Sequence, residues 1–225
     1  MKKFKTLNKV TLQQGFDFLS EKEPAFKRIL EEKNYDINPF SKKSGFEGLI
    51  GLIIEQQLSV ASAKAIFKRL KKLVVPFEPE AFLKVDIQSF KEAGLSKQKI
   101  DYCSGIAEKI KNKELDLNSL SHKEDSEVVE ELIKIRGIGD WTAQCYLMAC
   151  LKRLDAWPSS DLGLVVAIQR LRGMKERPDY LTIEKISESW TPFRTVAALI
   201  LWLSLIHISE PTRRYAISYA VFCLK

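Results

Sequence analysis

Apolar residues recur at helical spacing along almost the whole chain of 225 residues. Steps of three and four positions place them on one face of a helix, and no segment shows the period of two that a strand would need. The pattern predicts helices over residues 11–20, 24–33, 49–54, 63–70 and 100–110. Ser59 and Ser96 stand just before two of these runs as candidate N-caps. We therefore expect an all-α fold.

The length of the chain suits two small helical lobes that share a cleft, and 45% hydrophobic residues are enough for a core. We expect residues from about 46 to 125 to form one lobe. The N-terminal helices and residues from about 126 to 202 would form the other lobe. The cleft between the lobes would be the working site, because ligands prefer such clefts.

The last 23 residues are interpreted separately from the rest of the chain. Residues 203–213 and 217–224 match in-frame translations of two parts of a DNA-sequencing adapter, and the three codons between them fit a sample index. Such segments must be set aside before a fold is argued. We expect residues 1–202 to form the domain and residues 203–225 to be an adapter-derived artefact. The alternative is a natural amphipathic C-terminal helix.

Charge and cysteine content narrow the class of protein. A net charge of +7 and a pI of about 9.1 are compatible with a polyanionic partner. The chain has no apolar run of about 18 residues and no signal-peptide core, which predicts a cytoplasmic protein without a membrane partner, nucleoid-associated in a bacterium. Cys103, Cys145, Cys150 and Cys223 show neither CxxC pairing nor zinc-ligand spacing, so we expect reduced core residues and no metal.

The stretch "KIRGIGDW", residues 134–141, predicts a hairpin between two helices. Ser126 is a candidate cap for the first helix, and the chain would turn at Gly137 and Gly139 before the second begins. Glycines allow positive φ and let backbone N–H groups approach a ligand, while a helix N-terminus adds positive potential. The combination suits a phosphate, and such a contact carries no base sequence information. The alternative is a purely structural turn.

A wider set of motifs resembles the helix-hairpin-helix DNA glycosylase superfamily, in its 3-methyladenine DNA glycosylase II, or alkylpurine glycosylase, branch. The hairpin string is "LIKIRGIGDWTA", and the acidic residue that the family places about twenty positions later is Asp161 of "WPSSDLG", twenty residues after Trp141. Three more stretches match in order: "IIEQQLSVASAKAI", "AGLSKQKIDYCSGIAEKI" and "WTPFRTVAALILW". The resemblance covers residues from about 20 to 202 and implies that the cleft binds DNA.

The resemblance implies an enzyme that turns an alkylated purine out of the duplex and hydrolyses its N-glycosidic bond. Asp161 would stabilise the oxocarbenium-like charge and orient the attacking water. Its alternative role is the N-cap of the helix "LGLVVAIQRL", and one residue can do both. Gly137, Ile138, Gly139 and Thr142 would bind the DNA backbone.

Family positions also predict a pocket for the extruded base. Trp141 and Trp202 would line it, since a cationic alkylpurine is attracted to aromatic faces; the alternative for both is an ordinary core aromatic. The family has an aromatic residue where this chain has Cys145, which leaves the base preference open. Arg194 would bind phosphate or support the pocket.

A second family region, formed by Gln56, Gln57 and Leu58, would fill the gap left by the base. The alternative is a polar helix terminus with a buried leucine. Bifunctional glycosylase/lyases place a Schiff-base lysine where this chain has Trp141, and the cysteines of iron–sulfur relatives are absent. The resemblance thus implies a monomeric, monofunctional enzyme without cofactor, which acts on double-stranded DNA with damaged bases and leaves an abasic site. The alternatives are a non-catalytic DNA-binding protein and a glycosylase for another lesion.

Overall fold

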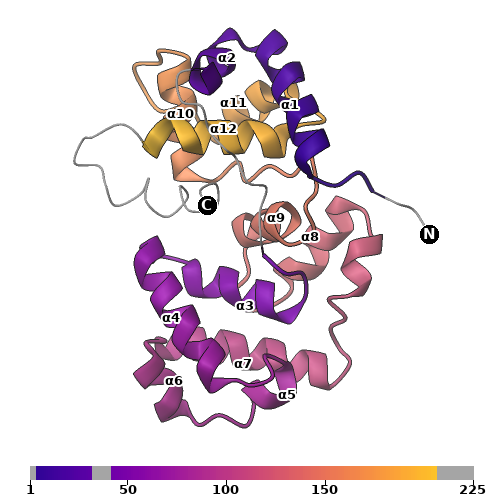
Figure 1. Cartoon of the computed structure of the whole chain (residues 1–225), viewed down its shortest axis with the longest axis vertical. Helices are drawn as coiled ribbons and strands as arrows, with labels where there is room; N and C mark the ends of the chain where they lie inside the picture. The colour runs from indigo at the N-terminus through magenta and orange to yellow at the C-terminus, as the bar shows by residue number, and fades with distance from the viewer. Residues whose placement is uncertain (1–3, 32–41, 207–225) are drawn as a thin grey trace. The chain divides into compact units, whose positions relative to one another are not determined.

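The computed structural model describes residues 4–31 and 42–206. Within these residues the regular structure is helical, apart from an isolated bridge between Thr6 and Arg153, so the predicted all-α class is confirmed. The chain forms two compact units, which we call unit 1 (residues 42–146) and unit 2 (residues 4–31 and 147–206). Figure 1 labels the helices of both units.

Unit 1 is built around a buried helix, α3. It contains α3 (Phe46–Glu55), α4 (Val60–Leu73), α5 (Pro79–Phe82), α6 (Ile87–Ala93), α7 (Lys97–Lys111), the short 3-10 helix η1 (Ser119–His122), α8 (Asp125–Ile133) and most of α9 (Asp140–Ala149). Apart from Glu47 and Glu55, the residues of α3 are apolar and buried, and α4 and α7 pack against it. A helix that is apolar all round is stable only inside a core.

Two of the three predicted N-caps are confirmed. The side chains of Ser59 and Ser96 accept hydrogen bonds from backbone amides in the first turns of α4 and α7. The third prediction, Ser126, is wrong, because α8 begins at Asp125 and Ser126 therefore lies inside its first turn. Glu124 caps that helix, and the Glu127 side chain accepts a hydrogen bond of 2.8 Å from the Glu124 amide, so a capping box defines the start.

The central helix of unit 2 is α12 (Arg194–Ile206). It packs against α1 (Lys9–Lys22), α2 (Pro24–Glu31) and α10 (Leu162–Leu171). A further helix, α11 (Tyr180–Glu188), completes the unit. Residues 195–203 of α12 are buried throughout. Gly15 permits the close approach of α1, because a Cβ atom there would lie 2.8 Å from Cγ2 of Val196.

The division between the units lies about twenty residues later than the predicted lobe boundary at residue 126, since it falls after Tyr146, within α9. Contacts in unit 1 explain the difference. The Tyr146 hydroxyl accepts a hydrogen bond of 2.9 Å from the Gly45 amide, and the Gln56 side chain donates to the Gly137 carbonyl. These contacts attach α8, the hairpin and the start of α9 to unit 1.

The cysteines, the C-terminal segment and the length of the helices were also predicted from the sequence. Cys103, Cys145 and Cys150 are buried and are not in disulfide bonds, as predicted, while Cys223 lies outside the described residues. Residues 203–206 form the last turn of α12, and the rest of the suspected adapter segment lies outside the described residues, so its interpretation stays a prediction. Among the helices described, none combines the length and the apolar character that crossing a bilayer requires.

Candidate functional site

The hairpin predicted from "KIRGIGDW" is present between α8 and α9. Gly137 has a φ of +92°, in the left-handed region that favours glycine. Ile138 is buried and anchors the turn, and its amide donates to the Ile135 carbonyl at 3.0 Å. The Gly139 carbonyl accepts from the Ala143 amide at 3.0 Å, which makes the first hydrogen bond of α9.

The two glycines of the hairpin have different environments. A Cβ atom at Gly137 would lie 2.3 Å from Cδ2 of Tyr102, so a side chain is excluded there by packing as well as by φ. A Cβ atom at Gly139 would meet nothing within 4 Å, and Gly139 is exposed. The fold therefore requires glycine at position 137, whereas the open surface at Gly139 leaves room for a partner to approach the backbone.

Gln56 connects the hairpin to the end of α3. Its side-chain amide donates to the Gly137 carbonyl and to the Thr142 hydroxyl, at 3.0 Å in each case. Thr142 is buried, so its side chain supports the hairpin from inside unit 1. Of the residues predicted to contact the DNA backbone, Gly139 is the exposed one, while the side chains of Ile138 and Thr142 point into the protein.

Gln56, Gln57 and Leu58 lie side by side in the turn between α3 and α4, but their side chains have different environments. The Gln56 side chain is directed to the hairpin, whereas Gln57 is exposed and has a φ of +56°, which is uncommon for a residue with a side chain. Leu58 is half-buried. Within the triplet that was predicted to enter the strand gap, Gln57 is thus the residue at the exposed apex.

Lys99 fixes this turn and was missed by sequence reasoning. Its ammonium group donates to the carbonyls of Ile54, at 2.6 Å, and Gln56, at 2.7 Å, where α3 ends. A cation at a helix C-terminus is favourable because the last carbonyls have no helical partner. Burial lowers the pKa of Lys99 from its usual value. The sequence did contain one indication that Lys99 faces the protein interior. Lys99 lies one helical turn before the buried Cys103 on α7.

Asp161 is the N-cap of α10, as the alternative reading of this residue predicted. Its Oδ1 accepts a hydrogen bond of 2.9 Å from the Leu164 amide. The same oxygen accepts a hydrogen bond of 3.1 Å from Nε1 of Trp202, a contact that sequence reasoning did not anticipate. Asp161 is 1% exposed and Trp202 is 2% exposed. The two residues therefore form one buried polar pair between α10 and α12.

Trp141 and Cys145 lie on α9, four residues apart and hence on one face of that helix. Trp141 is half-buried and Cys145 is buried. Both belong to unit 1, whereas Asp161 and Trp202 belong to unit 2. A shared pocket formed by these four residues stays a prediction.

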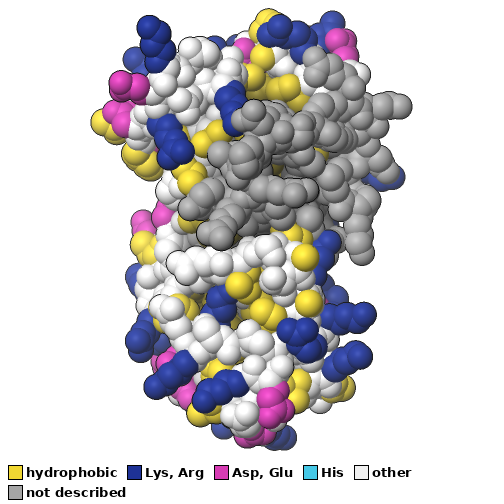
Figure 2. Space-filling model, turned by 90° about the vertical axis from the view of Figure 1, so that its left-hand side faces the viewer, with side chains coloured by type: hydrophobic (Ala, Val, Ile, Leu, Met, Phe, Trp, Pro, Cys, Tyr) yellow, Lys and Arg dark blue, Asp and Glu magenta, His cyan; other side chains and the backbone are white. Residues whose placement is uncertain are grey.

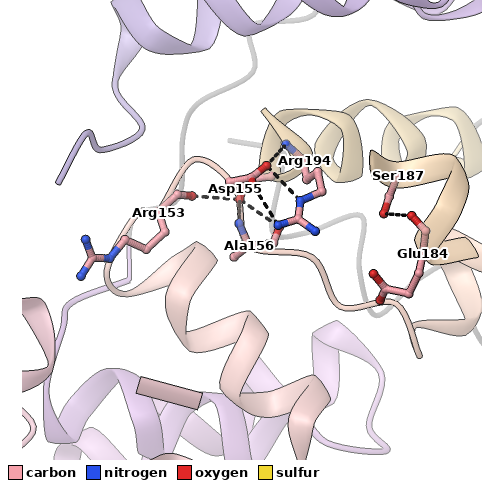
Figure 3. Close-up of polar contacts among 7 residues, drawn as sticks. Arg153, Asp155, Ala156, Glu184, Ser187 and Arg194 are labelled. Atoms are coloured by element: carbon pink, nitrogen blue, oxygen red, sulfur yellow. Dashed lines mark hydrogen bonds and ion pairs between the residues drawn. The ribbon is translucent and has the colours of Figure 1, made fainter. Parts of the chain in front are cut away.

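Arg194 is held by an ion pair with Asp155 (Figure 3). Nε and Nη2 of Arg194 donate to the two carboxylate oxygens of Asp155, at 3.0 and 2.8 Å, and the Arg194 amide adds a third contact at 3.2 Å. Such a bidentate pair fixes both side chains in orientation as well as in distance. Of the two predicted roles of Arg194, phosphate binding and support, the ion pair favours support.

Basic residues are not gathered into one patch on the face shown in Figure 2. Lysine and arginine side chains are spread over both units there, and acidic side chains lie between them. Lys134 and Arg136 are exposed beside the hairpin. Within the described residues, no three His, Cys, Asp or Glu side chains come together in an arrangement that could hold a metal ion.

Comparison with known proteins gives a consistent result. Residues 50–193 match the model of the HhH-GPD superfamily base excision DNA repair protein. DNA-3-methyladenine glycosylase 1 of Schizosaccharomyces pombe is 34% identical over 191 residues, which are 80% of this chain and 82% of that protein. A DNA-3-methyladenine glycosylase of Bacillus subtilis is 33% identical over 172 residues. The chain spans just over half the length of the two Bacillus subtilis relatives that it matches, 59% and 56%.

Solved structures show the same fold. The S. pombe 3-methyladenine DNA glycosylase Mag1, in complex with abasic DNA, has a TM-score of 0.79 and 29% identity, and the match covers 88% of this chain and 99% of that one. A DNA-3-methyladenine glycosidase from Bacillus halodurans has a TM-score of 0.72 and 28% identity, with 92% and 95% covered. The hairpin, the aspartate that follows it and these matches together place the chain in the HhH-GPD superfamily of base excision DNA repair proteins.

Proposed function

We propose that this protein is a DNA glycosylase that excises alkylated purines of the 3-methyladenine type from double-stranded DNA. The observation that carries the proposal is the buried Asp161–Trp202 pair, in which Asp161 follows the hairpin residue Trp141 by twenty positions in a chain of this superfamily. Relatives that cover most of the chain are named for the same activity. Because the proposed substrate is DNA, the protein should be found where the cell keeps its DNA. In a bacterium this is the nucleoid, in the cytoplasm.

The hairpin supplies the sequence-independent part of DNA binding. The exposed backbone at Gly139, at the start of α9, offers N–H groups and the positive end of a helix to a phosphate. Gln57, at the apex of the turn held by Lys99, is placed to enter the gap that an extruded base leaves. We propose these two sites as the contacts that hold the strand while the damaged base leaves the stack.

Asp161 supplies the chemistry. Its Oδ1 accepts hydrogen bonds from the Leu164 amide and the Trp202 indole, and we propose that the carboxylate is ionised. This negative charge would stabilise the oxocarbenium-like sugar as the N-glycosidic bond breaks, and it would orient the water that attacks the sugar. An alkylated purine that already carries positive charge is a good leaving group, so a dedicated general acid is not needed.

We further propose a monofunctional, monomeric enzyme that uses no lysine nucleophile. The position that carries the Schiff-base lysine in glycosylase/lyases is Trp141 in this chain. The product would be an intact strand with an abasic site. Trp141 and Trp202 would face the base, and Cys145 would widen the pocket where relatives have an aromatic ring.

Duplex DNA treated with a methylating agent tests the proposal. The protein should release free 3-methyladenine, and the strand should break only after alkali converts the abasic site. Strand cleavage by the protein alone, or covalent trapping by borohydride, would contradict the monofunctional mechanism. Tight binding of abasic DNA without any base release would favour the second candidate, a non-catalytic DNA-binding protein that uses the same hairpin.

A further inference from the structure

The segment that leads into Asp161 has no helix of its own. α9 ends at Ala149 and α10 begins at Leu162, and residues 153–161, which we call the Asp161 segment, run between them. Local hydrogen bonds join Ser159 to Trp157, at 3.1 Å, and the Asp161 amide to Pro158, at 2.9 Å. These short turns do not connect the segment to the rest of unit 2, so other contacts must fix its position.

Thr195 provides the first of these contacts. The residue is fully buried on α12, and its hydroxyl lies 2.9 Å from the Arg153 carbonyl and 3.1 Å from the Ala156 carbonyl. A hydroxyl donates one hydrogen and accepts others, and the Ala156 amide donates to it at 3.1 Å. The Thr195 amide donates to the Leu154 carbonyl at 3.0 Å. One residue thus holds the backbone of the segment at Arg153, Leu154 and Ala156.

Arg194, the neighbour of Thr195, provides the second contact through its ion pair with Asp155. Figure 3 shows the Arg194 guanidinium beside the Asp155 carboxylate, next to Arg153 and Ala156. Because both side chains are about one quarter exposed, water screens part of the attraction. The bidentate geometry contributes orientation more than energy.

Trp202 provides the third contact, at the other end of the segment, through its hydrogen bond to Asp161. It follows Thr195 by seven residues on α12, which is two helical turns and about 10 Å along the axis. Positions seven apart share a helix face. α12 is also buried from Thr195 to Leu203 against three neighbouring helices, so it forms a rigid support.

We propose that α12 positions the catalytic carboxylate: Arg194 and Thr195 hold the start of the Asp161 segment and Trp202 holds its end. This inference rests on the proposed function of Asp161. It gives Trp202 a positioning role in addition to its predicted place in the base pocket. Reaction rates fall steeply when a reacting group moves by about 1 Å, so loss of either end should slow base release without weakening the grip on DNA.

Thr195→Val tests one end of this support and Trp202→Phe tests the other. Valine keeps the shape of threonine without its hydroxyl, and phenylalanine keeps an aromatic ring without the indole N–H. We expect each variant to lower the single-turnover rate of base release about 10-fold or more, while the Kd for abasic DNA changes less than about threefold. Thr195→Ser, which retains a hydroxyl, should restore most of the rate.

Ser187→Ala is the matched control. Ser187 is another fully buried hydroxyl of unit 2, and it donates to the Glu184 carbonyl within its own helix, α11 (Figure 3). This variant should keep the wild-type rate. An equal loss of rate in Ser187→Ala, or wild-type rates in both Thr195→Val and Trp202→Phe, would overturn the inference.

Hydrogen exchange separates this inference from the proposed function. Thr195→Val should speed amide exchange at Ala156 and Asp161, whose backbone positions depend on the support, and Ser187→Ala should not. If the wild-type protein releases no base but exchange responds as expected, the proposed function fails and the positioning by α12 stands. If base release slows while exchange at both amides stays unchanged, the positioning fails.

Discussion

Substitution of the two hairpin glycines by alanine should separate folding from DNA binding. At Gly137 the φ of +92° costs an alanine about 1–2 kcal/mol, because the left-handed region brings Cβ too close to the backbone. The Cβ would also lie 2.3 Å from the Tyr102 ring, and relief of such overpacking costs a further ~1–3 kcal/mol. We expect Gly137→Ala to lower the free energy of unfolding by about 2–5 kcal/mol.

Gly139→Ala should behave differently, because its Cβ has no neighbour within 4 Å in the protein. Alanine is a poorer residue than glycine at the start of a helix, so a loss of up to ~1 kcal/mol is expected. On DNA the methyl group would stand where the phosphate must approach the backbone. Loss of one hydrogen bond to a charged group costs about 1.5–3 kcal/mol, which corresponds to roughly 10–100-fold in Kd.

The assay combines urea unfolding with fluorescence anisotropy on abasic duplex DNA at a fixed salt concentration. Gly139→Ala should unfold close to the wild-type protein and bind DNA roughly 10–100-fold more weakly. Gly137→Ala should unfold at markedly lower urea. Wild-type DNA binding by Gly139→Ala, or wild-type stability of Gly137→Ala, would contradict the roles assigned to the two glycines.

Two further predictions concern α7. Lys99→Met leaves the Ile54 and Gln56 carbonyls without the Lys99 donor, so it should lower the free energy of unfolding in urea titrations by about 1–2 kcal/mol. The control is Lys97→Met, at an exposed position, which should stay within ~0.5 kcal/mol of the wild type. Burial raises the pKa of the Cys103 thiol from 9.0 to about 12, so as pH rises above 9.0 the unfolded chain loses this proton first and stability falls. Between pH 8 and pH 10 the wild-type protein should lose about 1.4 kcal/mol relative to Cys103→Ala, and parallel pH profiles would contradict this.

Local sequence determines the features that were predicted well. The apolar period of α3, α4 and α7 reflects burial of one or more faces of each helix, and burial is what stabilises them. Ser59 and Ser96 cap helices within their own first turn. The left-handed φ that favours glycine at position 137 was visible in the motif, whereas the Tyr102 ring that also excludes a side chain there was not.

Tertiary contacts determine what the sequence could not predict. Ser126 is a good capping residue, but Glu124, two residues earlier, forms a capping box with Glu127, and the competition between the two caps depends on side-chain geometry. The hydrogen bond between Trp202 and Asp161 joins residues 41 positions apart. Lys99 and Thr195 donate to carbonyls of distant segments, and the position of each residue on its own helix does not specify those partners. Motif matching located Asp161, and packing determined which residues hold it.

The catalytic role of Asp161 is tested most directly by the single-turnover release of 3-methyladenine by Asp161→Asn, compared with Asp179→Asn. Both residues cap a helix through Oδ1, and asparagine caps as well as aspartate, so neither change should unfold the protein. Asp179 is exposed at the start of α11 and serves as the control. We predict that Asp161→Asn loses base release by about 100-fold or more and still binds abasic DNA, while Asp179→Asn retains both. Wild-type base release by Asp161→Asn would contradict catalysis by this carboxylate.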